Sequence, residues 1–364
     1  MTGTSLDACD MAILETDGET IFAFGPAGER KLSEETRSLV LEATHAAMAW
    51  ERGEPEPESF TPAAEAVARE HFAAAEEFLT QNGLAWADID LIGMHGQTVL
   101  HERPLDGRVG RTVQLGDAQW LADAAGVLVA FDFRTADVAA GGEGAPLAPI
   151  YHLARAQSAG MAAPLAVLNV GGVANVTFWS GGEDIAAFDT GPGNGMIDLL
   201  MQSRGAGRFD EGGKYASVGK ADEVVLSGLL AHPYFKAPPP KSLDRYDFSL
   251  EPLEALRLED AAATLVAFTA EALKLGFDIM GGSPTELIVC GGGRRNPTLM
   301  AAFAERLDVP VTTAEDHGWR GDSIEAEAFA YLAARTARGL PISFPKTTGV
   351  PAPMTGGRIV RPNR

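Results

Sequence analysis

The sequence is poor in cysteine and in positive charge. Its 2 cysteines, Cys9 and Cys290, lie far apart without metal-ligand spacing, which excludes a disulfide framework and suits a reducing compartment. With 29 Lys and Arg against 50 Asp and Glu, the net charge of −21 disfavours nucleic acid and anionic membranes as partners. No apolar run approaches the roughly 20 residues of a membrane span, and we see no secretion signal. We therefore expect a cytoplasmic protein that has neither nucleic acid nor a membrane as partner.

Length and pattern indicate a two-lobed α/β protein. At 364 residues the chain is long for one core, and its 41 glycines indicate many tight turns. Predicted strands alternate with predicted helices, which is typical of α/β lobes with largely parallel sheets. Residues 139–146 form the most hinge-like segment. We expect an N-terminal lobe over 1–140 and a C-terminal lobe over 141–364, with the tail 339–364 packing across the surface.

Polar side chains follow short apolar segments in the first lobe. A predicted strand over 89–94 leads to His95 and Gln97, and another over 127–131 leads to Arg134. Polar residues placed repeatedly at strand ends predict a site along one edge of the sheet. A single histidine is often structural, and an exposed arginine is often only solvated, so both readings stay open here.

The second lobe is predicted to open with three strands that lead to a carboxylate. Gly171-Gly172 and Gly181-Gly182 are predicted turns, the third strand is expected to end at Phe188, and Asp189 follows. A Gly-Pro-Gly turn then precedes a helix that starts at about Asn194. A carboxylate facing backbone N–H groups and a helix N-terminus is suited to act as a general base beside an anion. Alternatively, Asp189 only closes a turn.

Glycine turns beside strands recur three times, at Gly3, at Gly171-Gly172 and at Gly291 to Gly293. Bare backbone at such turns can reach phosphate oxygens. No Gly-Lys-Ser/Thr follows any of them, and the spacing is not that of a dinucleotide fingerprint. Together they suggest nucleotide phosphates held between two lobes.

A family resemblance adds to these patterns. The hairpins over 2–10 and 169–177 resemble those of the actin, sugar-kinase and heat-shock ATPase superfamily. A longer series of motifs, in order, resembles the anhydro-N-acetylmuramic acid kinase family: Gly3 to Asp7, His95 to Thr98, Gly141 to Pro146, Asn169 to Asn175, Asp189 to Asn194, His232 to Phe235 and Cys290 to Pro297. The resemblance implies a two-lobed actin-like ATPase (ribonuclease H-like) fold with the nucleotide in the interlobe cleft.

The resemblance also implies an activity. ATP and water would convert 1,6-anhydro-N-acetylmuramic acid into N-acetylmuramic acid 6-phosphate in cell-wall recycling, with Mg²⁺ as cofactor and a homodimer as the assembly. The family's general base corresponds to Asp189. Glu325 is a second catalytic candidate. Alternatively, Glu325 is only a carboxylate that the helix dipole stabilises in the first turn of a helix. Two other readings remain, a nucleotide-regulated interaction protein of the actin or chaperone type and an inactive sugar-binding relative.

The remaining candidate residues are expected to bind Mg²⁺, the sugar or ATP. Asp7 could hold Mg²⁺ through water, or Asp7 and Asp10 could only cap the turn and hairpin. His95 and Gln97 could form hydrogen bonds with the sugar. Arg134 or Lys241 could form an ion pair with its lactyl carboxylate. The expected ATP-binding residues are Gly3, Thr4, Ser5, Leu6, Asp7, Ala8, Cys9, Asp10, Gly171, Gly172, Gly291, Gly292 and Gly293.

Three departures from the family pattern stand out. The strand that normally precedes Gly3 is absent from this sequence, which would leave a sheet edge uncovered. Ala8 replaces a usual glycine and would cost roughly 1 kcal/mol if its backbone had positive φ. Glu143 replaces a common glutamine, which adds charge near the hinge.

Overall fold

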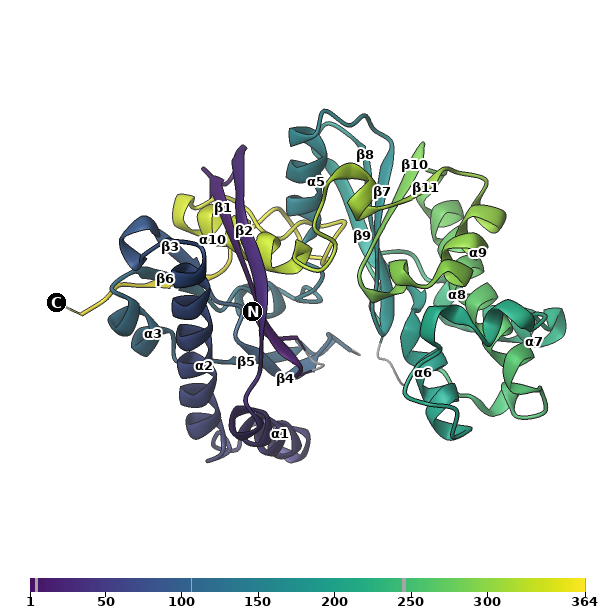
Figure 1. Cartoon of the computed structure of the whole chain (residues 1–364), viewed down its shortest axis with the longest axis horizontal. Helices are drawn as coiled ribbons and strands as arrows, with labels where there is room; N and C mark the ends of the chain where they lie inside the picture. The colour runs from purple at the N-terminus through teal and green to yellow at the C-terminus, as the bar shows by residue number, and fades with distance from the viewer. Residues whose placement is uncertain (4–5, 106, 244–246, 364) are drawn as a thin grey trace. The chain divides into compact units, whose positions relative to one another are not determined.

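A computed structural model describes residues 1–3, 6–105, 107–243 and 247–363 of the chain (Figure 1). Its contacts define two compact units. Unit 1 comprises Met1–Ala159 and Ser323–Arg364, and unit 2 comprises Gly160–Asp322. This division differs from the expected boundary at 140/141. The C-terminal segment belongs to unit 1 because α10 (Ile324–Arg338) packs against β1 (Ala8–Thr16) and β3 (Leu91–Gly93).

The tail also joins unit 1 through a strand. β12 (Arg358–Val360) pairs antiparallel with β6 (Leu128–Phe131), and β6 pairs parallel with β3. β1 pairs only with β2 (Ile21–Lys31) among the named strands, and β4 (Gln97–Glu102) pairs with β5 (Arg111–Leu115). β4 and β5 form an antiparallel hairpin, whereas the sequence pattern predicts largely parallel sheets.

Local signals set most element ends in unit 1. Gly18, with φ of 84°, makes the turn between β1 and β2. Ser33 accepts the backbone N–H of Thr36 and caps α1 (Glu34–Ala49). Asp117 caps α3 (Ala118–Ala125), which ends at Gly126 in the left-handed conformation. The other helices are α2 (Phe60–Gln81), α4 (Thr135–Ala139) and α5 (Pro149–Ser158).

Unit 2 contains one five-stranded sheet in the order β11-β10-β7-β8-β9. β7 (Leu165–Val170), β10 (Glu286–Cys290) and β11 (Val311–Thr313) are parallel, while β8 (Val173–Gly181) and β9 (Asp184–Pro192) add antiparallel strands. The long helix α8 (Leu258–Met280) buries Phe268, Leu273 and Phe277 in the core. The other helices are α6 (Asn194–Ser203), α7 (Glu223–Leu230) and α9 (Pro297–Leu307).

None of the helices in the described part of the chain combines the length and the apolar character that crossing a membrane requires.

Candidate functional site

The first glycine turn of unit 1 is described at Gly3, Leu6 and Asp7. The carbonyl of Gly3 accepts the backbone N–H of Leu6 at 3.2 Å and Nε2 of Gln97 at 3.3 Å. Leu6 has a φ of 52°, and Oδ1 of Asp7 accepts the N–H of Ala8. Asp7 is exposed, whereas Thr4 and Ser5, which belong to the expected ATP loop, lie outside the described residues.

Ala8, Cys9 and Asp10 form the start of β1. Ala8 pairs with Lys31, so its backbone is extended and the suspected cost of positive φ does not arise. Burial raises the pKa of the Asp10 carboxyl to about 7, against the opposing effect of the terminal ammonium. Burial also raises the pKa of Cys9, but His71 and the terminal ammonium lower it to about 6 overall.

His95 and Arg134 meet in unit 1. Arg134 donates from Nε to Nε2 of His95 at 3.2 Å and from Nη1 to the carbonyl of Gly144 at 2.7 Å. Burial and the positive charge of Arg134 hold the pKa of His95 well below its usual range. His95 is therefore neutral and accepts a hydrogen bond from Arg134 while its Nδ1 faces the carbonyl of Gly96.

Glu325 and Gln97 extend this cluster. The Phe329 ring lies 4.5 Å from that of His95, and Glu325 lies one helical turn before Phe329 on α10. The surrounding protein raises the pKa of Glu325, and Arg134 opposes this shift. Gln97 is buried, and among the described residues its Oε1 has no hydrogen-bond partner. The structure thus brings together four of the expected site residues in unit 1.

Asp137 supports this cluster and was missed in the sequence. Its carboxylate accepts the N–H of Gly144 at 2.7 Å and the hydroxyl of Thr348. Because Arg134 donates to the carbonyl of the same glycine, Asp137 helps to position the loop that holds Arg134. The available signal was an aspartate just before a glycine-rich loop. In that loop, Glu143 donates its N–H to the carbonyl of Thr348 at 2.6 Å.

Asp189 lies within β9 of unit 2, where it pairs with Asn175 of β8. The prediction that the strand ends at Phe188 was wrong, because pairing between Val173 and Pro192 extends it. Asp189 is half-buried, and its Oδ2 accepts the N–H of Leu243 at 2.8 Å. The carboxylate is therefore held in one orientation by the segment that packs along the edge of β9.

Lys241 belongs to this segment. Its carbonyl accepts the N–H of Asp189 at 3.0 Å, and its Nζ donates to the carbonyl of Tyr234 at 3.0 Å. Tyr234 also donates its hydroxyl to the carbonyl of Asp189, a contact that the sequence did not indicate. Burial lowers the pKa of Lys241 to about 8. Lys241 and Asp189 are thus neighbours in unit 2.

The two glycine turns of unit 2 meet at one end of its sheet, because β7 and β10 are parallel and Asn169 pairs with Cys290. A Cβ at Gly291 would lie 2.3 Å from Oδ1 of Asn169, and one at Gly293 would lie 2.4 Å from Cγ1 of Val170. These two glycines are required by packing. A Cβ at Gly172 or Gly292 would meet nothing within 4 Å, so their bare backbone is open to a ligand.

The start of α6 differs from the expected anion site. The N–H groups of Asn194 and Gly195 donate to the carbonyls of Gly171 and Gly172, at 2.8 and 3.0 Å. The N–H of Gly193 also donates to the carbonyl of Gly172. These amides therefore stabilise the glycine turn and are not the free donors beside Asp189 that the sequence suggested.

Arg294 anchors the third glycine turn and was missed. It is buried, donates to the carbonyl of Gly291 at 2.8 Å, and pairs with Glu315 and Asp322. No sequence signal separated it from the exposed Arg295 beside it.

No group of three or more His, Cys, Asp or Glu that could hold a metal ion occurs in the described ranges. Asp7 is a single exposed carboxylate, which fits an ion that is also held by phosphate oxygens and water.

The described residues form a two-unit α/β protein with glycine turns at strand ends. The family model described as anhydro-N-acetylmuramic acid kinase matches residues 1–362, and the chain belongs to this family of phosphotransferases. A relative of that name from Phenylobacterium zucineum (strain HLK1) is 75% identical over 362 residues, covering 100% of this chain and 98% of the relative. Another from Caulobacter vibrioides is 69% identical, covering 99% and 97%.

Among solved structures, similarity is found to an activator of 2-hydroxyisocaproyl-CoA dehydratase from Clostridium difficile with bound ADPNP. Its TM-score is 0.42 and its identity 13%, covering 91% of this chain and 92% of that chain. A xylulose kinase from Bifidobacterium adolescentis has a TM-score of 0.33 and 14% identity over 97% and 83%.

Proposed function

We propose that this chain is an ATP-dependent kinase that opens the 1,6-anhydro bond of 1,6-anhydro-N-acetylmuramic acid and phosphorylates O6. The product would be N-acetylmuramic acid 6-phosphate, in cell-wall recycling. The observation that carries the proposal is the match over residues 1–362 to the family described by that kinase name. A cytoplasmic location and a homodimer are part of the proposal, and sedimentation of the purified chain tests the dimer.

Asp189 is the proposed general base. It would take a proton from water as the water oxygen bonds to C1 of the sugar and the C1–O6 bond breaks. O6 would receive the γ-phosphoryl group, so phosphoryl transfer replaces the general acid of an ordinary glycosidase. The hydrogen bond from Leu243 to one carboxylate oxygen supports this role, because it fixes the orientation of the group. Attack opposite O6 would invert the anomeric centre.

Unit 1 supplies the proposed sugar-binding groups. Gln97 offers a buried oxygen that has no partner in the described ranges, and neutral His95 is fixed by Arg134. Arg134 is a cation suited to the lactyl carboxylate, and Lys241 of unit 2 is the other candidate. Glu325 would assist Asp189 near the water.

The glycine turns are the proposed ATP-binding segments. Open backbone at Gly172 and Gly292 fits phosphate contacts, as does the turn from Gly3 to Asp7. ATP would supply the phosphoryl group, and Asp7 would hold Mg²⁺ through water. Ala8, Cys9 and Asp10 would contribute through the position of β1.

The test is ADP release with and without 1,6-anhydro-N-acetylmuramic acid. We expect sugar-dependent release that falls by about 10²–10⁴-fold in Asp189→Asn. Asp184→Asn, at the exposed start of the same strand, is the matched control and should retain activity. Sugar-independent ATP turnover would favour a nucleotide-regulated interaction protein. Sugar binding without turnover would favour an inactive relative. The first-formed anomer, read by NMR, tests inversion.

A further inference from the structure

Arg294 lies at the centre of a hydrogen-bond network in unit 2. Its side chain is 5% exposed, whereas those of its partners Glu315 and Asp322 are about half-exposed. Nε and Nη2 donate to Glu315 at 2.9 and 2.8 Å, and Nη1 donates to Asp322 at 3.0 Å. The hydrogen bond from Arg294 lowers the pKa of both carboxyls, so both are ionised near neutral pH. The guanidinium is therefore held in one position by charged partners.

Another donor of Arg294 fixes the backbone of the third glycine turn. Its Nη1 donates to the carbonyl of Gly291 at 2.8 Å. In a planar trans peptide the carbonyl and the following N–H point in opposite directions, so this bond directs the N–H of Gly292 away from Arg294. A Cβ at Gly292 would meet nothing within 4 Å in the described part of the chain. The guanidinium therefore orients a backbone donor at the residue of the turn that has open space around it.

The same network holds residues 315–322, the segment that ends unit 2. Asp322 is the last residue of this unit. The N–H of Gly321 donates to Oε1 of Glu315 at 3.2 Å. A Cβ at Gly321 would lie 2.6 Å from Cζ of Arg294 and 2.6 Å from Oε1 of Glu315, so the guanidinium packs directly on this backbone. A shift of the guanidinium therefore requires a shift of the segment.

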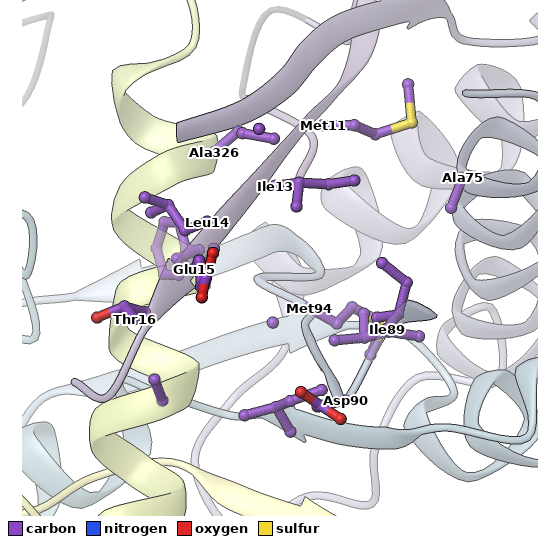
Figure 2. A pocket seen from close by; sticks show the side chains of 18 of the residues that line it. Met11, Ile13, Leu14, Glu15, Thr16, Ala75, Ile89, Asp90, Met94 and Ala326 are labelled. Carbon is purple, nitrogen blue, oxygen red and sulfur yellow. The ribbon is translucent and has the colours of Figure 1, made fainter. Parts of the chain in front are cut away.

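After Asp322 the chain enters α10, whose position is set by packing within unit 1. α10 packs against both β1 and β3. In Figure 2, Ala326 of this helix lies on the same side of β1 as Leu14, beside a cavity of about 910 Å³ that β1 and β3 also line. The connection after Asp322 is therefore held by the Arg294 network on the side of unit 2 and by helix packing on the side of unit 1.

We propose that Arg294 is a positioning residue for the nucleotide, and that it couples the glycine turn at Gly291 to Gly293 with the segment 315–322. Because this turn is a proposed ATP-binding segment, the role of Arg294 rests on the proposed function. Arg294 would not itself contact ATP, since each of its three side-chain nitrogens already has a partner. ATP would hold the turn in the conformation that Arg294 supports, and would thereby protect the segment. The coupling is reciprocal, so loosening of the segment would weaken the binding of ATP by the same factor.

The test measures the Kd of Mg-ATP by calorimetry, without sugar, for the wild type and three variants. Gly321→Ala keeps every charge and does not require positive φ, but its methyl group occupies the place where the guanidinium packs, so Arg294 must shift. Arg294→Met removes the network. Arg295→Met is the matched control, because it removes the same charge from the exposed neighbouring residue. We expect the Kd to rise about tenfold in the first two variants, and by less than about twofold in the control.

Two further measurements separate positioning from a general loss of stability. KM for 1,6-anhydro-N-acetylmuramic acid should stay within about twofold of the wild type in every variant, because all of its proposed ligands lie outside residues 291–322. Hydrogen exchange over residues 315–322 should slow on addition of ATP in the wild type and in Arg295→Met, but not in the other two variants. Unchanged exchange of β8 in the absence of ATP shows that each variant is folded.

The outcomes distinguish the coupling from the proposed function. Equal affinities for ATP in all four chains would overturn the role of Arg294 and leave the proposed function intact. An equal loss of affinity in Arg295→Met would also overturn it, because the charge beside the turn, and not its position, would then set the affinity. ATP that binds the wild type without protecting residues 315–322 would overturn the coupling. A wild type that does not bind ATP would overturn the proposed function and the role of Arg294 together.

Discussion

Unit 2 folds around one continuous sheet, whereas the strands of unit 1 are divided among separate sheets. In unit 2 the core is a single large cluster in which Leu168, Val176 and Phe188 of the sheet pack with Phe268 of α8. In unit 1 the buried apolar residues form smaller clusters under individual helices. The contrast shows that the same α/β layering can be continuous or interrupted within one chain, and that the interruption in unit 1 coincides with the cavity beside β1.

The glycine turns of the two units also differ, in the charge of the groups that hold them. Buried Arg294 connects the turn at Gly291 to the carboxylates of Glu315 and Asp322, so a charged network holds this turn of unit 2. The turn at Gly3 in unit 1 is held by neutral hydrogen bonds from Leu6 and Gln97. We therefore expect the glycine turn of unit 2 to be the more rigid of the two.

The largest predicted effect tests the two cores. Phe268→Ala should destabilise unit 2 by about 3–5 kcal/mol, because a fully buried ring leaves a cavity. Ile13→Ala in unit 1 should cost only about 1 kcal/mol, since Ile13 is half-buried and already lines an opening. Urea unfolding followed by hydrogen exchange in each unit measures both. Similar losses at the two positions would mean that β1 is packed as tightly as the core of unit 2.

The next effect concerns the anchored turn. Arg294→Met should cost about 2–3 kcal/mol, because it removes a buried cation with two carboxylate partners and a bond to Gly291. Arg295→Met is the control and should cost less than about 1 kcal/mol, since its ion pair with Asp322 is exposed. Urea midpoints give the free energies, and faster exchange over residues 290–296 should accompany only the first variant. Equal costs would show that burial of Arg294 contributes no stability.

A pH-dependent effect separates two carboxyls of unit 1. The pKa of Asp10 is raised to about 7, so the folded state binds this proton more tightly than the unfolded state. Its stabilising contribution is present below about pH 4 and is lost as the pH rises to about 7. After allowance for its partial exposure, Asp10→Asn should gain about 1–2 kcal/mol relative to the wild type between these limits.

Asp17 is the control with the opposite sign. Backbone N–H groups of Thr20 and Glu19 lower the pKa of Asp17, so its contribution is present above its unfolded pKa and is lost on acidification. Asp17→Asn should therefore lose stability at neutral pH and not in acid. Urea unfolding of both variants across this pH range measures the difference. A pH-independent difference for Asp10→Asn would show that Asp10 has an ordinary pKa.

Local chemistry allowed much of the fold to be predicted from the sequence. The turn at Gly18, the caps at Ser33 and Asp117, and the end of α3 at Gly126 are all set by neighbouring residues. Strand pairing was harder to predict. Gly191-Pro192 reads as a strand end, but pairing with β8 continues β9 through it. Likewise, packing of α10 on β1 and β3 returns the C-terminal segment to unit 1.

In the candidate site too, contacts between residues distant in sequence were not predicted. His95, Gln97 and Arg134 were identified because polar residues follow apolar segments, and the structure places them close together with Glu325. Their supporting groups were not found. Asp137, Arg294 and Tyr234 act through partners distant in sequence, so their roles depend on tertiary contacts. Sequence reasoning therefore identifies candidate polar residues at strand ends more readily than the residues that hold those candidates in place.

The smallest predicted effect compares helix ends in the two units. Asp308 ends α9 of unit 2 with a φ of 52° and is exposed, whereas Gly126 ends α3 of unit 1 with a φ of 69° and open space around it. Asp308→Gly should gain about 0.5 kcal/mol, because relief of the left-handed conformation outweighs the added entropy of the unfolded chain. Gly126→Ala should lose about 1 kcal/mol for the converse reason. Thermal unfolding of both variants should give shifts of opposite sign. If Asp308→Gly is destabilising instead, the aspartate side chain stabilises that helix end by more than its backbone conformation costs.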